Sequence, residues 1–106
     1  LIVELSQYVY ACTHLDLTEQ ARLASVDIIK REAARSTKPF FITGDLNAEP
    51  HDEPITRLGD DFQILNDTTQ PTFPASEPDI CIDYILVSKG SGSARVRRSK
   101  VLIKLI

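Results

Sequence analysis

Four polar residues stand at places in the sequence where a packed sheet has no need for them. His14 ends the apolar run YVYACTH, Asp45 follows PFFITG, and Asn47 comes two residues later. Asp83 lies inside the run ICIDYILVS, where a carboxylate is disfavoured and, if buried, needs a histidine, an arginine, a hydroxyl or a metal as its partner. Such groups suit phosphoester hydrolysis, which needs a positioned water molecule, a base or orienting group, and cationic help for the phosphoryl oxygens.

Each of the four side chains can take one part in that chemistry. Asp45 can orient or deprotonate water, and Asn47 can donate an amide N–H to a phosphate oxygen. A protonated His14 can bind phosphate or assist the leaving group, while Asp83 can hold an imidazole in its useful tautomer. The structural interpretation stays open beside this one, because Gly, Asp and Asn are ordinary turn residues and a histidine at a strand end is usually structural.

The elements that must position these residues follow from propensity and periodicity. A helix is expected over residues 16–36, capped by Asp16 or Thr18, with an imperfect apolar stripe of Ala21, Ala24 and Ile28. The other expected elements are a β-hairpin over 1–5 and 8–14, a buried strand over 38–45, a short helix over 53–59, a loop over 66–79, a buried strand over 80–88, and one or two strands over 94–106. The order β-β-α-β-α-β-β predicts a layered α/β or α+β fold.

Composition limits the remaining choices. The chain has 106 residues, so one domain at most is expected, and its net charge of −3 does not indicate nucleic acid as a partner. A basic cluster at Arg95, Arg97, Arg98 and Lys100 reads more readily as a solvated strand face than as a phosphate-binding patch. No apolar run reaches the roughly 20 residues that a membrane span needs. Both ends are apolar, so we expect a piece of a larger domain, of unknown compartment.

The two cysteines, Cys12 and Cys81, lie in apolar strand-like runs. A free buried thiol is the commonest state there, and a bridge between the two stays open as an alternative. No CxxC spacing indicates structural zinc or redox chemistry.

The blocks VYACTHLDL, PFFITGDLNAEP, PTFP and CIDYILVS, in this order, resemble the second half of the endonuclease/exonuclease/phosphatase (DNase I-like) superfamily. The resemblance covers roughly residues 8–88. It implies an α/β (α+β) fold, namely half of a four-layered α/β sandwich with a mainly antiparallel or mixed sheet covered by helices. It also implies metal-dependent phosphoester cleavage with Mg²⁺ or Mn²⁺ as the cofactor.

The resemblance also implies a role for individual residues. His14 would bind and polarise the phosphate, Asp45 would orient the attacking water, and Asp83 would orient a late histidine. Asn47 would contact the phosphate or a metal, with Asp45 as the other metal ligand on this chain, and Thr72 would contact the phosphate. The remaining histidine, His51, reads as a surface residue.

The chain departs from the family pattern at both ends. Nothing here corresponds to the first half, which supplies the main metal-binding carboxylates and a glutamate partner for His14, and the final Ser-Asp-His block is missing. We therefore expect residues 1–106 to be a partial domain, inactive alone and prone to self-association through an uncovered sheet face.

The leading interpretation is a metal-dependent phosphodiesterase or phosphatase in the full-length parent, acting on a phosphoester of unknown type. The alternative is a non-catalytic scaffold or binding domain that keeps the fold. A calcineurin-like metallophosphoesterase should show a Gly-Asn-His-Asp/Glu block, and the sequence has none.

Overall fold

The computed structural model describes residues 1–91 and 96–101. These residues form a five-stranded sheet in the order β1-β2-β3-β5-β4. The pairs β1/β2, β3/β5 and β4/β5 are antiparallel, and β2/β3 is parallel. The predicted α/β fold with a mixed, mainly antiparallel sheet is therefore confirmed. The elements are β1 (Ile2–Glu4), β2 (Val9–His14), α1 (Glu19–Arg35), β3 (Phe40–Asp45), α2 (Glu53–Leu58), β4 (Phe62–Ile64), β5 (Asp83–Ser88) and a 3₁₀ turn at Lys89–Ser91.

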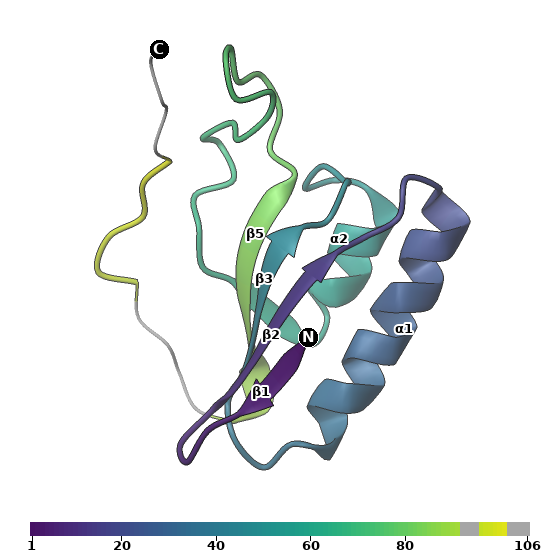
Figure 1. Ribbon diagram of the computed structural model, residues 1–106, viewed down its shortest axis with the longest axis vertical. Helices are drawn as coiled ribbons and strands as arrows, with labels where there is room; N and C mark the ends of the chain where they lie inside the picture. Colours follow the sequence, from purple (N-terminus) through teal and green to yellow (C-terminus); the bar gives the residue numbers. More distant parts are fainter. Residues whose placement is uncertain (92–95, 102–106) are drawn as a thin grey trace.

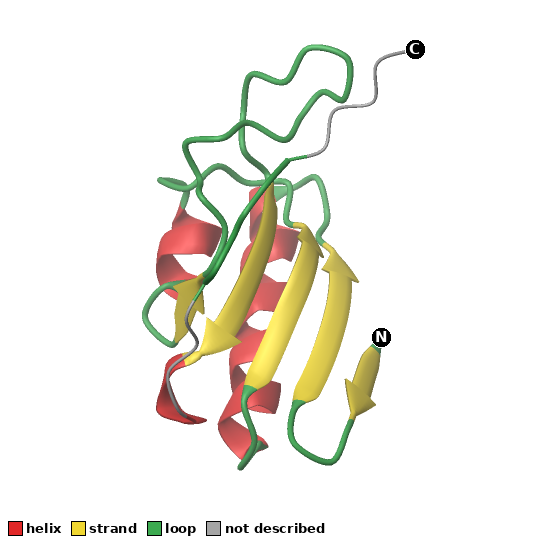
Figure 2. Ribbon diagram, turned by 90° about the vertical axis from the view of Figure 1, so that its left-hand side faces the viewer, coloured by secondary structure: helices red, strands yellow, loops and turns green. Residues whose placement is uncertain are grey.

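Both helices pack on one face of the sheet, as Figures 1 and 2 show from two directions. The core lies between the two helices and the sheet. The sheet contributes alternate residues to it, among them Val9, Ala11, Phe40, Ile42, Tyr84 and Leu86. From the helices, Val26, Ile55 and Leu58 are almost completely buried against this surface. The fold is thus held together on the helix side of the sheet.

The opposite face of the sheet, which we call the outer face, carries the other half of each strand. Three rows cross β2, β3 and β5 there in register: Tyr10, Phe41 and Val87; Cys12, Thr43 and Ile85; and His14, Asp45 and Asp83. Residues 96–101 lie on this side of the sheet, away from the helices in Figure 1 and near β5 in Figure 2. The outer face is mainly apolar over the first two rows, where the hydroxyls of Tyr10 and Thr43 bond to each other, and polar in the third.

Helix α1 shows one correct and one wrong prediction. Thr18 caps it, since its hydroxyl oxygen accepts the N–H of Ala21 at 3.3 Å, and the helix lacks Gly and Pro throughout. The expected stripe is wrong: Ile28 is 53% exposed, whereas Val26 is buried and Ile29 and Ala33 pack against the core. The helix therefore packs on the sheet with the face that carries Val26, Ile29 and Ala33, and not with the face that carries Ala24 and Ile28.

The strands require three corrections. β5 begins at Asp83, so this residue stands at the start of a strand and not in its middle. The three-residue strand β4 was not predicted, because it is too short to show a period. Residues 96–101 form no strand, and residues 92–95 and 102–106 of the predicted last strands lie outside the described residues.

The two cysteines are free thiols in different surroundings. Cys81 is buried as predicted, but Cys12 lies on the outer face and is exposed, so its predicted burial is wrong. No helix in the described ranges is long and apolar enough to cross a membrane.

Candidate active site

Three of the predicted site residues form one row across the sheet. β2 and β3 are parallel and end together, so His14 and Asp45 are Cα partners, and the antiparallel β5 places Asp83 opposite Asp45. The Nε2 atom of His14 lies 3.5 Å from Oδ2 of Asp45, with the His14 side chain 73% exposed and that of Asp45 30% exposed. An imidazole and two carboxylates therefore lie side by side where β2 and β3 end and β5 begins, and the imidazole is exposed to solvent.

Gly44 brings the strand ends this close together. Its φ is +144°, and a Cβ built on it would lie 1.8 Å from the carbonyl oxygen of Thr13 on β2. Only a residue without a side chain fits there, since an L-residue disfavours this φ and would collide with backbone. The glycine of GDLN is thus required by the approach of two strands just before the row.

The backbone after β3 is fixed from both sides. The N–H of Leu15 donates to the carbonyl oxygen of Asp45 at 2.9 Å, and the N–H of Leu46 donates to that of Ile82 at 2.8 Å. The Leu46 side chain is completely buried in the core. An apolar residue between two polar ones therefore serves as the anchor that turns its neighbours outward.

Asn47 is locked beside Asp45. It adopts a left-handed φ of 49°, which asparagine tolerates better than most residues. Its N–H donates to Oδ1 of Asp45 at 2.9 Å, and its Nδ2 donates to the carbonyl oxygen of Leu15 at 2.6 Å. An amide nitrogen has two N–H groups, so Asn47 keeps donor capacity beyond the bond to Leu15. The turn and the candidate site are therefore the same structure.

Tyr84 supports the segment that follows the GDLN turn, and the sequence did not point to it. Its hydroxyl lies 2.7 Å from the carbonyl oxygen of Ala48 and 3.1 Å from that of Cys81. Burial raises the pKa of Tyr84, and burial likewise raises the pKa of the Cys81 thiol. A tyrosine at a core position of a strand needs a hydrogen-bond partner for its hydroxyl, and this requirement could have identified Tyr84 from the sequence.

Thr72 lies at the start of β5, beside Asp83. Its Oγ1 accepts the N–H of Ile82 at 3.1 Å and that of Asp83 at 3.2 Å. Asn66, which sequence reasoning missed, donates from Nδ2 to the carbonyl oxygen of Asp83 at 3.2 Å. Two side chains from the loop after β4 thus hold the backbone of Asp83.

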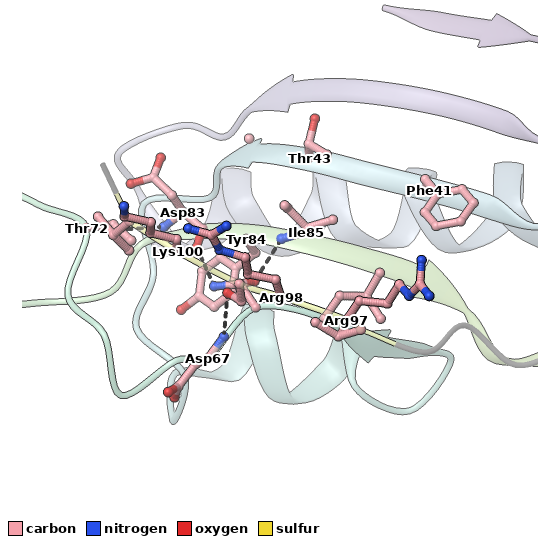
Figure 3. Close-up of a pocket in the computed structure, with 16 residues that line it drawn as sticks. Phe41, Thr43, Asp67, Thr72, Asp83, Tyr84, Ile85, Arg97, Arg98 and Lys100 are labelled. Atoms are coloured by element: carbon pink, nitrogen blue, oxygen red, sulfur yellow. Dashed lines mark hydrogen bonds between the residues drawn. The ribbon is translucent and has the colours of Figure 1, made fainter. Parts of the chain in front are cut away.

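A cavity of about 1080 Å³ opens between the outer face and residues 96–101 (Figure 3). Phe41, Thr43 and Ile85 contribute to its wall from the sheet, and Asp83 and Thr72 lie at one end of it. Arg97, Arg98 and Lys100 line it from the other side and are exposed, although the segment that carries them is not the predicted strand.

Two further features lie apart from this row. His51 is 78% exposed and pairs with Asp52 at 3.7 Å, so its prediction as a surface residue is confirmed. Among residues 1–91 and 96–101 no group of three or more His, Cys, Asp or Glu side chains is arranged to hold a metal ion. Asp45 and Asn47 alone do not make a metal site, and both have protein partners here.

The sequence is similar to one known family along nearly its whole length. The model of the "Endonuclease/Exonuclease/phosphatase family" matches residues 6–102. No curated protein matches the sequence.

Three of the similar solved structures illustrate the likeness. A functionally unknown conserved protein from Enterococcus faecalis V583 has 26% identity and a TM-score of 0.56, over 76% of this chain and 37% of that one. The mannosyl-6-phosphatase Bt3783 of Bacteroides thetaiotaomicron has 20% identity and a TM-score of 0.60, over 78% and 38%. The human Nocturnin catalytic domain with bound sulfate anion has 18% identity and a TM-score of 0.58, over 77% and 36%.

The chain therefore spans less than two fifths of each of these structures. The family model, by contrast, covers nearly all of this chain, including the row of His14, Asp45 and Asp83. This chain belongs to the endonuclease/exonuclease/phosphatase family.

Proposed function

We propose that this chain forms part of a hydrolase that cleaves phosphoester bonds. The observation that carries the proposal is the row of His14, Asp45 and Asp83, which lie side by side at the ends of three adjacent strands. Membership of the family supports it, as do a structural neighbour named as a phosphatase and another that holds a sulfate anion. Because the chain spans less than two fifths of those neighbours, the activity is proposed for the full-length parent.

In this proposal the roles follow from donors and acceptors. Asp45 orients the attacking water, since its carboxylate is half-buried, accepts a bond from Asn47 and stays accessible. His14, exposed and 3.5 Å from Asp45, binds a phosphoryl oxygen when it is protonated. The second N–H of the Asn47 amide donates to another phosphoryl oxygen. Asp83 then orients a histidine from outside this chain.

We further propose Mg²⁺ or Mn²⁺ as the cofactor of the parent. Within the described ranges the side chains do not suffice for such a site, so the remaining ligands would have to come from elsewhere. When bound, a cation of this kind offsets the negative charge of the phosphoryl oxygens.

The test is turnover of bis-(p-nitrophenyl) phosphate and p-nitrophenyl phosphate by the full-length parent, with Mg²⁺, with Mn²⁺ and with EDTA. We expect metal-dependent turnover of at least one substrate by the parent. The 106-residue chain alone should show little or none, because its described residues lack a complete ligand set. A folded parent that turns over neither substrate would favour the scaffold interpretation, and robust turnover by the isolated chain would contradict the proposed dependence on other residues.

A further inference from the structure

Asp83 is held in place by side chains as well as by its strand neighbours. Oγ1 of Thr72 accepts the N–H groups of Ile82 and Asp83 at 3.1 and 3.2 Å. On the other side, Nδ2 of Asn66 donates to the carbonyl oxygen of Asp83 at 3.2 Å, and its Oδ1 accepts the N–H of Ile85 at 2.9 Å. These four bonds lie on both sides of Asp83, the first residue of β5.

The two clamping side chains are themselves anchored. Asn66 directly follows Leu65, whose N–H donates to the carbonyl oxygen of Ile85 at 2.7 Å, so Asn66 continues the β4–β5 pairing with its side chain. The N–H of Thr72 donates to the carbonyl oxygen of Ile80 at 2.8 Å. Both side chains are partly buried in the described structure, and Figure 3 shows Thr72 next to Asp83.

We propose that Asn66 and Thr72 are positioning residues that fix the carboxylate of Asp83 in the row with Asp45 and His14. The inference rests on the proposed function, in which Asp83 belongs to the site. It assigns a role to Asn66 and gives Thr72 a positioning role in place of the expected phosphate contact. A hydroxyl oxygen has two acceptor sites and one O–H donor, and in Thr72 the N–H groups of Ile82 and Asp83 occupy the acceptor sites. A phosphate contact would use the O–H donor instead, and the second experiment below separates that contact from the positioning role.

The effect on chemistry follows from geometry. A displacement of about 1 Å at a reacting group can cost about 10²-fold in rate. Losing the Thr72 acceptor frees the N–H groups of Ile82 and Asp83 and lets the start of β5 shift relative to Asp45. The clamp therefore acts on turnover through Asp83, without contact with the substrate.

The first experiment needs no activity. Amide hydrogen exchange in the 106-residue chain, followed by NMR, should show Ile82 and Asp83 exchanging about tenfold faster in Thr72→Val, the equivalent of one lost hydrogen bond. Thr72→Ser keeps the oxygen and should restore protection. Thr69→Val is the matched control, because the Thr69 hydroxyl donates to Asp67 within the same loop. Unchanged protection in Thr72→Val would overturn the clamp.

The second experiment uses the full-length parent. Thr72→Val and Asn66→Ala should each lower kcat about 10–100-fold with little change in KM, and Thr72→Ser should recover most of the loss. In an Asp83→Asn background, adding Thr72→Val should cost little more, because Thr72 acts on turnover only through the Asp83 carboxylate, which that background already lacks. A raised KM that persists in the Asp83→Asn background would overturn the inference in favour of direct phosphate contact.

The two experiments separate the inference from the function on which it rests. If the parent hydrolyses no phosphoester, the proposed function fails, while the exchange data still report whether the clamp exists. If the parent is active and the exchange data show no clamp, only the positioning role fails.

Discussion

At the scale of single residues, the substitution Asp45→Asn tests the proposed active site most directly. Asp45→Asn keeps the side-chain shape and the acceptor for the N–H of Asn47, but removes the charge and the basicity. In the full-length parent we expect kcat to fall by roughly 10²–10⁴, the usual range for a general acid–base group. KM should change little, since the lost interaction belongs to the transition state. Steady-state kinetics at saturating Mg²⁺ measure both.

The control for this variant is His51→Ala. His51 lies a few residues further along the same segment, is exposed, and pairs with Asp52 away from the row. Its kinetics should match those of the unmodified parent. A fully active Asp45→Asn enzyme would contradict the catalytic role of Asp45 and favour the interpretation of GDLN as an ordinary turn.

The sequence pointed to the residues of the row and to Thr72, although in another role, but not to Asn66. His14, Asp45 and Asp83 are conspicuous because each is polar in an apolar run, which is a local signal. Asn66 is one polar residue in a polar loop, and its role depends on a strand 17 to 19 residues away. The contact between His14 and Asp45 depends on the register of two strands, which no local pattern specifies.

At the scale of elements, Gly44 decides how closely β2 and β3 can approach. Gly44→Ala would place a Cβ 1.8 Å from the backbone of Thr13 at a φ of +144°. A strained backbone and overpacking each cost about 1–3 kcal/mol, so the free energy of unfolding should fall by roughly 2–6 kcal/mol. Urea denaturation measures it. Gly90→Ala, which meets nothing within 4 Å, should be nearly neutral, and equal stability of the two variants would contradict the close approach.

Tyr84 should link stability to alkaline pH. Burial raises its pKa, so the folded chain holds this proton more tightly than the unfolded chain does. The stabilisation is fully present below the ordinary tyrosine pKa of about 10 and is lost as the pH rises above it. At neutral pH, Tyr84→Phe should cost about 1–2 kcal/mol through the bond to Ala48.

Denaturation of both chains at about pH 8 and about pH 11 tests this linkage. The advantage of the unmodified chain over Tyr84→Phe should shrink at the higher pH, because only the unmodified chain must keep a buried phenol protonated. The exposed Tyr8 and Tyr10 are common to both chains and cancel in the comparison. A pH-independent difference would contradict the linkage.

Elements were predictable where their pattern was long. The helix over residues 19–35 and the strand over residues 40–45 follow from length, composition and flanking residues. β4 was not predicted because three residues are too few to show an alternating pattern. The start of β5 was predicted too early because the residues ICI before Asp83 are as apolar as the strand itself. The order of element types is the one predicted, but the sixth element is β4 and the seventh is β5.

At the scale of the whole molecule, the two faces of the sheet are unequal. Helices cover one face, while residues 96–101 lie on the side of the outer face, near β5 (Figure 2). That face keeps exposed apolar side chains such as Tyr10 and Ile85. Val3 of β1 pairs with Tyr10 and is also exposed, so the apolar surface continues to the sheet edge. Contiguous apolar patches of this kind mark places where another surface binds.

The isolated chain should therefore associate with itself through the outer face. Light scattering at micromolar concentration should show a dimer or a larger species, and a hydrophobic dye should bind. The double variant Tyr10→Lys/Ile85→Lys puts two charges on that face and should shift the chain to a monomer. Ile28→Lys, at a comparably exposed site on the far side of the helix layer, should leave association unchanged. A dilute, stable monomer without dye binding would contradict the prediction, and dissociation by Ile28→Lys instead would place the contact on the helices.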